Sequence, residues 1–177
     1  MIVSRGIAAP STYPDLRFVR LSDIDPAVLL DHMSDRRIAR HLPLLGTGWD
    51  LERIATFVQA KEQCWECDGL GHWAILIDQA YAGWGGFQKE GDDLDFGLVL
   101  RPECFTLGRL IFEHALEWLS AHRDIAEVTF LLPLSRSRRA PERLGARFRG
   151  EVLHAGTAFT KWSITVPCKL ASGVPLA

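Results

Sequence analysis

Long apolar runs and an excess of charge of either sign are both missing from this 177-residue chain. No apolar stretch reaches the roughly 18 residues that a membrane-spanning helix requires. The first residues lack the basic-then-apolar pattern of a signal peptide, so we expect a cytoplasmic protein. The formal net charge of −2 gives no sign of a nucleic-acid or membrane partner. The length fits one domain over residues 1–177, with its core at about 16–165.

Cysteine is also scarce, and its spacing argues against a metal site. Cys64 and Cys67 have C-x-x-C spacing, but Cys104 and Cys168 are isolated, whereas a structural zinc site needs about four suitably spaced ligands. A thioredoxin-type motif opens a helix after a strand. This motif comes at the end of a predicted helix instead. We therefore expect no metal and four packing or partly exposed thiols, and we keep a C-x-x-C redox protein as a minor alternative.

Hydrophobic periodicity predicts alternating strands and helices. The expected strands are 16–21, 72–77, 80–88, 94–100, 127–132, 147–152 and 158–165. Helices are expected after the caps Asp25 and Asp50, over 34–42, over 107–119 and over 135–144. Hairpin-length connections make most of the strands antiparallel, and the strand–helix–strand unit over 94–132 predicts one parallel crossover. The order indicates an α+β domain with a mixed, mostly antiparallel sheet flanked by helices.

Five local stretches in this order resemble the GNAT N-acetyltransferase superfamily, and in particular its ribosomal-protein-alanine acetyltransferase branch. They are 16–25, His72-Trp73-Ala74-Ile75, Ala82-Gly83-Trp84-Gly85-Gly86, Asp95–Glu103 and Arg143–Phe148. The resemblance implies the GNAT (acyl-CoA N-acyltransferase) fold and transfer of acetyl from acetyl-CoA to a primary amine. The acceptor would be a protein N-terminus or a small amine, and a homodimer is compatible with the sequence.

A cofactor site can be predicted where the strand at 94–100 leads into the helix at 107–119. A helix N-terminus offers free N–H groups and a partial positive charge to a pyrophosphate. The resemblance adds pairing of the pantetheine arm with the strand edge. The implied cofactor residues are Leu98, Val99, Leu100, Phe105, Thr106, Leu107, Gly108, Arg109 and Leu110.

This site departs from the family pattern at three positions. Thr106 stands where the family has a glycine, Glu103 where it has Gln or Arg, and Leu134 where the branch has an asparagine. The basic cluster at 136–143 lies where the ADP end of CoA would be reached, or else forms a solvated helix face. These departures keep a second hypothesis open, namely a CoA-binding or regulatory protein that retains the fold without efficient transfer.

The resemblance implies catalytic roles for Ser137 and Asp95. Ser137 would protonate the departing thiolate, and its alternative role is to cap the helix at 135–144. Asp95 would connect to the amine through water, and its alternative role is a solvated turn residue. Trp84, Trp73 and His41 are the expected acceptor-binding residues, with core packing as the alternative for both tryptophans.

Overall fold

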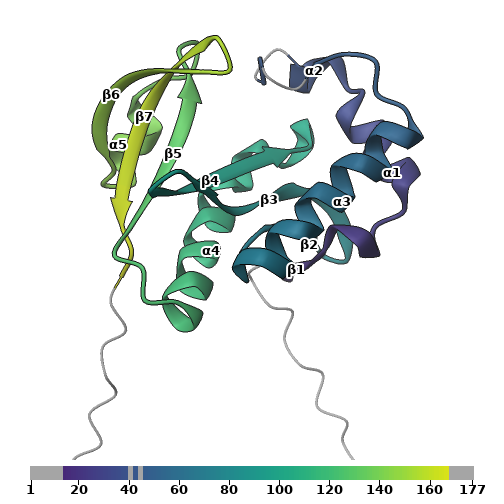
Figure 1. Cartoon of the computed structure of the whole chain (residues 1–177), viewed down its shortest axis with the longest axis horizontal. Helices are drawn as coiled ribbons and strands as arrows, with labels where there is room; N and C mark the ends of the chain where they lie inside the picture. The colour runs from purple at the N-terminus through teal and green to yellow at the C-terminus, as the bar shows by residue number, and fades with distance from the viewer. Residues whose placement is uncertain (1–13, 40–41, 44–45, 168–177) are drawn as a thin grey trace, which may run out of the picture.

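The computed structural model describes residues 14–39, 42–43 and 46–167, which form one sheet with helices on both faces (Figure 1). The strands are β1 Leu16–Arg20, β2 His72–Ile77, β3 Ala80–Glu90, β4 Asp93–Leu100, β5 Glu127–Pro133, β6 Arg147–His154 and β7 Thr157–Thr165. The helices are α1 Pro26–Met33, α2 Arg36–Ala39, α3 Leu51–Asp68, α4 Gly108–His122 and α5 Arg139–Arg143, with 3-10 helices η1 Leu21–Asp23 and η2 Pro102–Leu107.

The sheet has seven strands in the order β1-β2-β3-β4-β5-β7-β6. Only the β4–β5 pair is parallel among the pairs of the described residues. Helix α4 provides the crossover between these two strands, as the strand–helix–strand pattern predicts. The predicted α+β class, with a mixed and mostly antiparallel sheet, is confirmed.

Both predicted aspartate caps are present. The carboxylate of Asp25 accepts the N–H of Ala27 at 2.8 Å, and that of Asp50 accepts the N–H of Arg53 at 2.8 Å. Each cap satisfies a donor that the first helical turn leaves unpaired. Helix α3 then ends at Gly69, which adopts a left-handed φ of 62°. The caps therefore fix where α1 and α3 begin over the sheet.

The structure differs from the sequence prediction in two segments, 135–144 and 102–107. The predicted helix at 135–144 is only α5, because Ser137 turns the chain and its Oγ accepts the N–H of Arg139 at 3.3 Å. Pro141 lies in the first turn of α5, where a proline needs no N–H partner. The predicted cofactor loop is the 3-10 helix η2, which Pro102 starts and which runs directly into α4.

Each face of the sheet carries its own core. Helix α4 packs against aromatic side chains of β3, β4, β5 and β7, which include Phe87, Phe96, Phe130 and Trp162. On the opposite face α1 and α3 pack on β2 and β4, and this core is formed by Leu29, Ile54, Ala74 and Val99 among others. Figure 1 shows α3 crossing one face and α4 the other. The face of the sheet to which a strand side chain points therefore decides whether it packs against α4 or against α1 and α3.

The cysteines of the C-x-x-C motif lie within α3, not at a helix start. Both are free thiols, and the Cys64 thiol donates to the carbonyl of Ala60 at 3.4 Å. In the described part of the chain, no three His, Cys, Asp or Glu side chains gather where they would hold a metal ion. Among the same residues, every helix is too short or too polar to cross a membrane.

Close approach of β3 to β4 depends on a bare backbone at Gly83. A Cβ there would lie 2.3 Å from the carbonyl oxygen of Val99, and the φ of 155° is itself unfavourable for other residues. We expect Gly83→Ala to lower the free energy of unfolding by at least about 2 kcal/mol more than Gly91→Ala. Gly91 also has a positive φ, but its value of 63° lies in the left-handed region that other residues can reach, and it has open space around it. Urea unfolding of the two variants checks this, and equal losses would contradict it.

Candidate functional site

Strands β4 and β5 pair at one position and then separate. Asp95 pairs with Thr129, and no further pair joins the two strands in the described structure. Beyond this point β4 stays paired with β3 as far as Leu100, whereas β5 stays paired with β7 as far as Pro133. The two strands diverge toward the upper end of the molecule in Figure 1. The divergence opens a gap in the sheet at the C-terminal half of β4.

The edge of β4 that faces this gap offers backbone groups to a ligand. The N–H of Arg101 donates to the carbonyl of Ala82 in β3 at 2.8 Å. Because successive residues of a strand direct their backbone groups to opposite neighbours, those of Leu98 face β5, which has already separated. An unpaired strand edge is a template for another extended, amide-rich chain.

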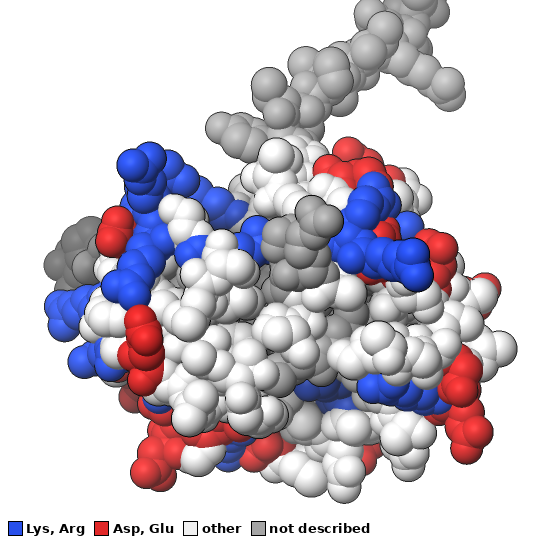
Figure 2. Space-filling model, turned by 90° about the horizontal axis from the view of Figure 1, so that it is seen from above, with Lys and Arg blue, Asp and Glu red and all other residues white. Residues whose placement is uncertain are grey.

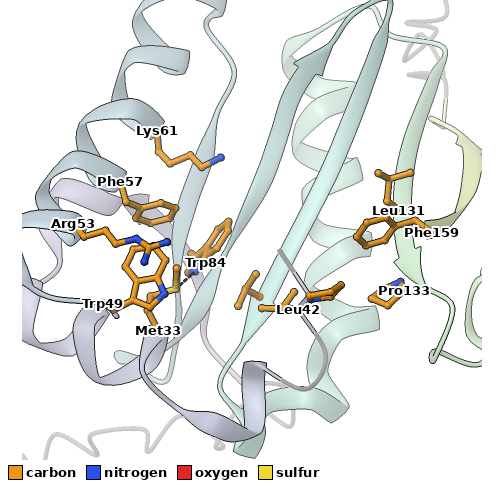
Figure 3. Close-up of a pocket in the computed structure, with 12 residues that line it drawn as sticks. Met33, Leu42, Trp49, Arg53, Phe57, Lys61, Trp84, Leu131, Pro133 and Phe159 are labelled. Carbon is orange, nitrogen blue, oxygen red and sulfur yellow. Dashed lines mark hydrogen bonds between the residues drawn. The ribbon is translucent and has the colours of Figure 1, made fainter. Parts of the chain in front are cut away.

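The first of two hollows beside the gap has a volume of about 370 Å³. It lies between α3 on one side and β5 and β7 on the other (Figure 3). Its lining residues are Met33, Leu42, Pro43, Trp49, Arg53, Phe57, Lys61, Trp84, Val99, Leu131, Pro133 and Phe159. Most of these side chains are apolar, so the hollow suits an apolar group.

Three aromatic rings form one wall of the first hollow. Phe57 meets Trp49 at 5.9 Å and Trp84 at 5.1 Å between ring centroids, in both cases edge to face. The indole N–H of Trp84 donates to the sulfur of Met33 at 3.3 Å, which fixes the ring (Figure 3). The guanidinium of Arg53 stacks over Trp49 at 4.2 Å. The wall is therefore held in place before any ligand arrives.

The second hollow has a volume of about 410 Å³ and is polar. Acidic side chains of β3 and β4 line it, namely Glu90, Asp93 and Asp95, together with Thr129 and Lys161. Lys161 forms an ion pair with Asp93. Leu131 and Phe159 line both hollows, so the two are neighbours, one apolar and one acidic, and we call them together the cleft.

Asp95 is the titratable group at the point where the strands part. Burial raises the pKa of its carboxyl group to about 6, and the negative charge of Glu90 adds to the rise. A hydrogen bond from the Thr129 hydroxyl, at 3.4 Å, acts in the opposite direction. A carboxylate with a pKa near 6 is ionised at neutral pH and still basic enough to accept a proton. Asp95 could therefore exchange a proton with a group bound in the second hollow near neutral pH.

The junction of η2 and α4 lies at the other end of β4. The N–H of Gly108 already donates to the carbonyl of Phe105, so one amide of the predicted anion site is in use. Arg109 pairs with Glu113 at 2.8 Å and stays exposed. Arg136, from the segment after β5, lies over the ring of Phe105 at 5.7 Å. Two exposed cations thus flank the start of α4.

The view from above shows Lys and Arg side chains on both sides of this face, with Asp and Glu side chains beside them (Figure 2). The carboxylate of Glu103 does not face this region as a free anion, since it pairs with Arg37 of α2 at 2.9 Å. This ion pair lowers the pKa of Glu103, with its own backbone hydrogen bond as the larger cause.

The structure brings together only some of the predicted site residues. Trp84, Val99 and Asp95 line the cleft. Trp73 does not, because it lies on the opposite face of the sheet, where it stacks on Phe18 at 4.8 Å. Ser137 is exposed before α5 and lines neither hollow. The expected acceptor residue His41 lies outside the described residues.

His72, the residue before Trp73, lies beside the cleft, where Trp73 was expected. His72 packs edge to face on Trp84 at 5.4 Å, and its ring lies over the bare backbone of Gly97. Burial lowers the pKa of His72 to about 3, so its imidazole is neutral. A neutral, buried imidazole here supports Trp84 and has little capacity as a base.

Among the lining residues that sequence reasoning missed are the three that α3 contributes, Arg53, Phe57 and Lys61. They follow each other at intervals of four, so they share one face of α3, and Trp49 lies four residues before Arg53, just ahead of the helix. This spacing is visible in the sequence. It escaped notice because the apolar stripe that docks α3 on the sheet gives the stronger periodic signal.

Solved acetyltransferase structures have a similar fold. A spermidine N-acetyltransferase from Vibrio cholerae, in complex with CoA and spermine, superposes with a TM-score of 0.68 at 10% identity, over 88% of this chain and 97% of that one. An aminoglycoside acetyltransferase in complex with coenzyme A superposes with a TM-score of 0.68 at 15% identity, over 86% of this chain and 95% of that one. A GNAT-family acetyltransferase from Bacillus anthracis superposes with a TM-score of 0.64 at 15% identity, over 85% of this chain and 93% of that one.

These similarities show that the chain has the GNAT fold, as its sequence resemblance implied. No family model matches the sequence, and no curated protein sequence matches it. At such low identities the superpositions establish the fold alone. They give no support to the ribosomal-protein-alanine branch over any other.

The raised pKa of Asp95 has a consequence for stability. Above pH 6 the carboxyl is ionised in both the folded and the unfolded chain, and the folded state bears the full cost of burying the charge. Below the unfolded pKa of 3.8 both states are protonated and the cost disappears. We expect Asp95→Asn to raise the free energy of unfolding at pH 7.5 by up to about 3 kcal/mol, and hardly at all at pH 3.5.

Denaturant unfolding at the two pH values measures this difference. Asp92→Asn in the exposed β3–β4 turn is the matched control, and we expect it to stay within about 0.5 kcal/mol of the wild type at both. A loss of stability for Asp95→Asn at pH 7.5 would show that the carboxylate is well solvated or well paired in the folded protein.

Proposed function

We propose that this protein transfers the acetyl group of acetyl-CoA to a primary amine. The observation that carries the proposal is the divergence of β4 and β5, which exposes the Leu98 backbone edge beside a cleft containing Asp95. The GNAT fold supports it, and two of the similar structures are complexes with CoA or coenzyme A. Acetyl-CoA is then a cosubstrate, and no metal is needed for the reaction.

The cofactor residues implied by the resemblance fit the two ends of this gap. The pantetheine arm would pair with the β4 edge at Leu98–Leu100, which β5 leaves unpaired. The pyrophosphate would lie at Phe105–Leu110, near the positive end of α4. Because the Gly108 amide is already bonded, more of the attraction would come from Arg109 and Arg136. Thr106, in place of a glycine, would contribute its hydroxyl.

The chemistry requires a neutral amine beside the thioester. Asp95 would accept a proton from the ammonium group, directly or through water, because its carboxylate has a pKa of about 6. The amine nitrogen then attacks the acetyl carbonyl carbon, the C–S bond breaks, and the nitrogen loses its extra proton, so that one proton is passed in net to the thiolate of CoA. Holding both substrates in one cleft supplies much of the rate.

Ser137 is the proposed source of the proton for the thiolate. Its Oγ accepts the N–H of Arg139, which leaves its own O–H free to donate. Ser137 is exposed ahead of α5, so this role requires the cofactor to extend along the gap toward that segment. Trp84 and its neighbours on the first hollow would hold the rest of the acceptor. The acceptor remains a protein N-terminus or a small amine.

Binding of the cosubstrate is tested by thermal unfolding with acetyl-CoA. A ligand at 100 times its dissociation constant stabilises the folded state by about 2.7 kcal/mol, so we expect a clear rise in Tm at millimolar acetyl-CoA. No rise would contradict any CoA site. A rise without thiol release from any amine would instead favour the second hypothesis, a CoA-binding protein that lacks transfer.

The role of Asp95 is tested by the same assays on Asp95→Asn. We expect kcat/KM for thiol release to fall by about 10²-fold or more, while the stabilisation by acetyl-CoA is unchanged. In the wild type, kcat/KM should rise with pH through an inflection near 6 that the variant lacks. Retention of that inflection in the variant would assign it to another group. Ser137→Ala, measured in parallel, separates loss of the acid from loss of the base.

A further inference from the structure

The charged side chains that line the first hollow are both cations, Arg53 and Lys61. Lys61 extends from α3 over the ring of Trp84, with its ammonium end toward the opening (Figure 3). It donates to the side-chain oxygen of Gln88 at 2.8 Å and lies 5.9 Å from the Phe57 ring and 5.8 Å from the Trp84 ring. Within the described residues, Lys61 forms no ion pair with a carboxylate.

A partly buried ammonium group without an ion-pair partner is stabilised when an anion binds beside it. Burial lowers the pKa of Lys61, which means that the folded chain solvates its ammonium group less well than water does. One neutral amide, two ring faces and the charge of Glu90 offset only part of that cost. A second cation in the same hollow, Arg53, adds to the positive potential. An anionic group placed here would gain an interaction that the protein itself supplies only in part.

The phosphates of CoA are not positioned to be that anion. Lys61 bonds to Gln88, which is the cross-strand partner of Asp95 near the start of β4. None of the residues 105–110, where the pyrophosphate is proposed to lie, lines the first hollow that contains Lys61. The counter-ion for Lys61 must therefore come from the acceptor.

The arrangement also limits how far the acceptor's anion lies from its amine. Gln88 and Asp95 are direct cross-strand partners, so their side chains are neighbours on one face of the sheet. A single side chain thus separates the proposed base from the ammonium group of Lys61. An acceptor whose amine meets Asp95 would place a group only a few bonds away beside Lys61. The aromatic wall of Trp49, Phe57 and Trp84 would receive an apolar substituent.

We propose that the acceptor is an amino acid with an apolar or aromatic side chain, and that Lys61 binds its carboxylate. This rests on the proposed acetyl transfer. It sets the chain apart from the similar structures whose names refer to spermidine and aminoglycosides, since those compounds carry several positive charges. Arg53 and Lys61, neither of which forms an ion pair among the described residues, would repel a second positive charge placed in the first hollow, whereas the acidic hollow would accept the amine.

The test compares phenylalanine, phenylalaninamide, phenethylamine and spermidine on protein saturated with CoA for calorimetry, and with acetyl-CoA for thiol release. We expect phenylalanine to bind at least about tenfold more tightly than the two compounds that lack the carboxylate, as a charge-assisted hydrogen bond would give. Spermidine should not bind measurably. Equal or tighter binding of the amide, the amine or spermidine would overturn the proposal.

Substitution of the lysine assigns the preference to its charge. Lys61→Met keeps the apolar stem of the side chain. We expect it to weaken the binding of phenylalanine at least tenfold, while the dissociation constant of phenethylamine changes less than threefold. Lys61→Arg should restore most of the preference. Lys89→Met is the matched control, because Lys89 is exposed and pairs with Asp68 at 2.7 Å away from the cleft. Equal weakening of all ligands by Lys61→Met would overturn the proposal. Since Lys61 is an unpaired cation, this variant should unfold at a Tm no lower than the wild type.

The two readouts separate this inference from the proposed function. Lys61-dependent binding of phenylalanine without thiol release would support the carboxylate site and count against transfer. Thiol release that is as fast with phenethylamine as with phenylalanine, in wild type and Lys61→Met alike, would support transfer and overturn the carboxylate site. Because the amine pKa differs among the compounds, rates are compared as ratios between wild type and variant for each one.

Discussion

The single parallel pair between Asp95 and Thr129 is the constraint on which the candidate site depends. On one side of it, β1 to β4 form an antiparallel half-sheet, and on the other, β5, β7 and β6 form a second one. Each half satisfies its own inner ladder of hydrogen bonds, so the strands can part without unravelling either half. The aromatic cluster around Phe96, Phe112 and Phe130 holds the two halves together on the α4 face. The gap is thus an unpaired edge supported by a packed core.

The same junction determines the electrostatics of Asp95. Where the strands still pair, the carboxyl group is enclosed enough for burial to raise its pKa. Where they part, the cleft gives that carboxyl access to a ligand. Geometry and acidity at this residue therefore share one cause.

Much of this fold follows from local sequence signals. The stripe of α4 and the caps Asp25 and Asp50 are encoded within a few residues, and each was predicted correctly. The face of β2 was not, because His72, Trp73, Ala74 and Ile75 are all buried. Alternation shows that His72 and Trp73 point to opposite faces, but when both faces are buried it cannot show which one meets the cleft. Only the arrangement of α3 and α4 settles that question.

Features that depend on packing between distant segments were also beyond the sequence. The 3-10 helix η2 and the short α5 reflect how Pro102 and Ser137 turn the chain as it leaves β4 and β5. The line of Trp49, Arg53, Phe57 and Lys61 is present in the sequence, but its importance is clear only once β5 is seen to leave that face of α3 uncovered. A stable helix needs no lysine partly buried beside two aromatic rings. Its position there, without a carboxylate partner among the described residues, is better explained by what the cleft binds than by what the fold requires.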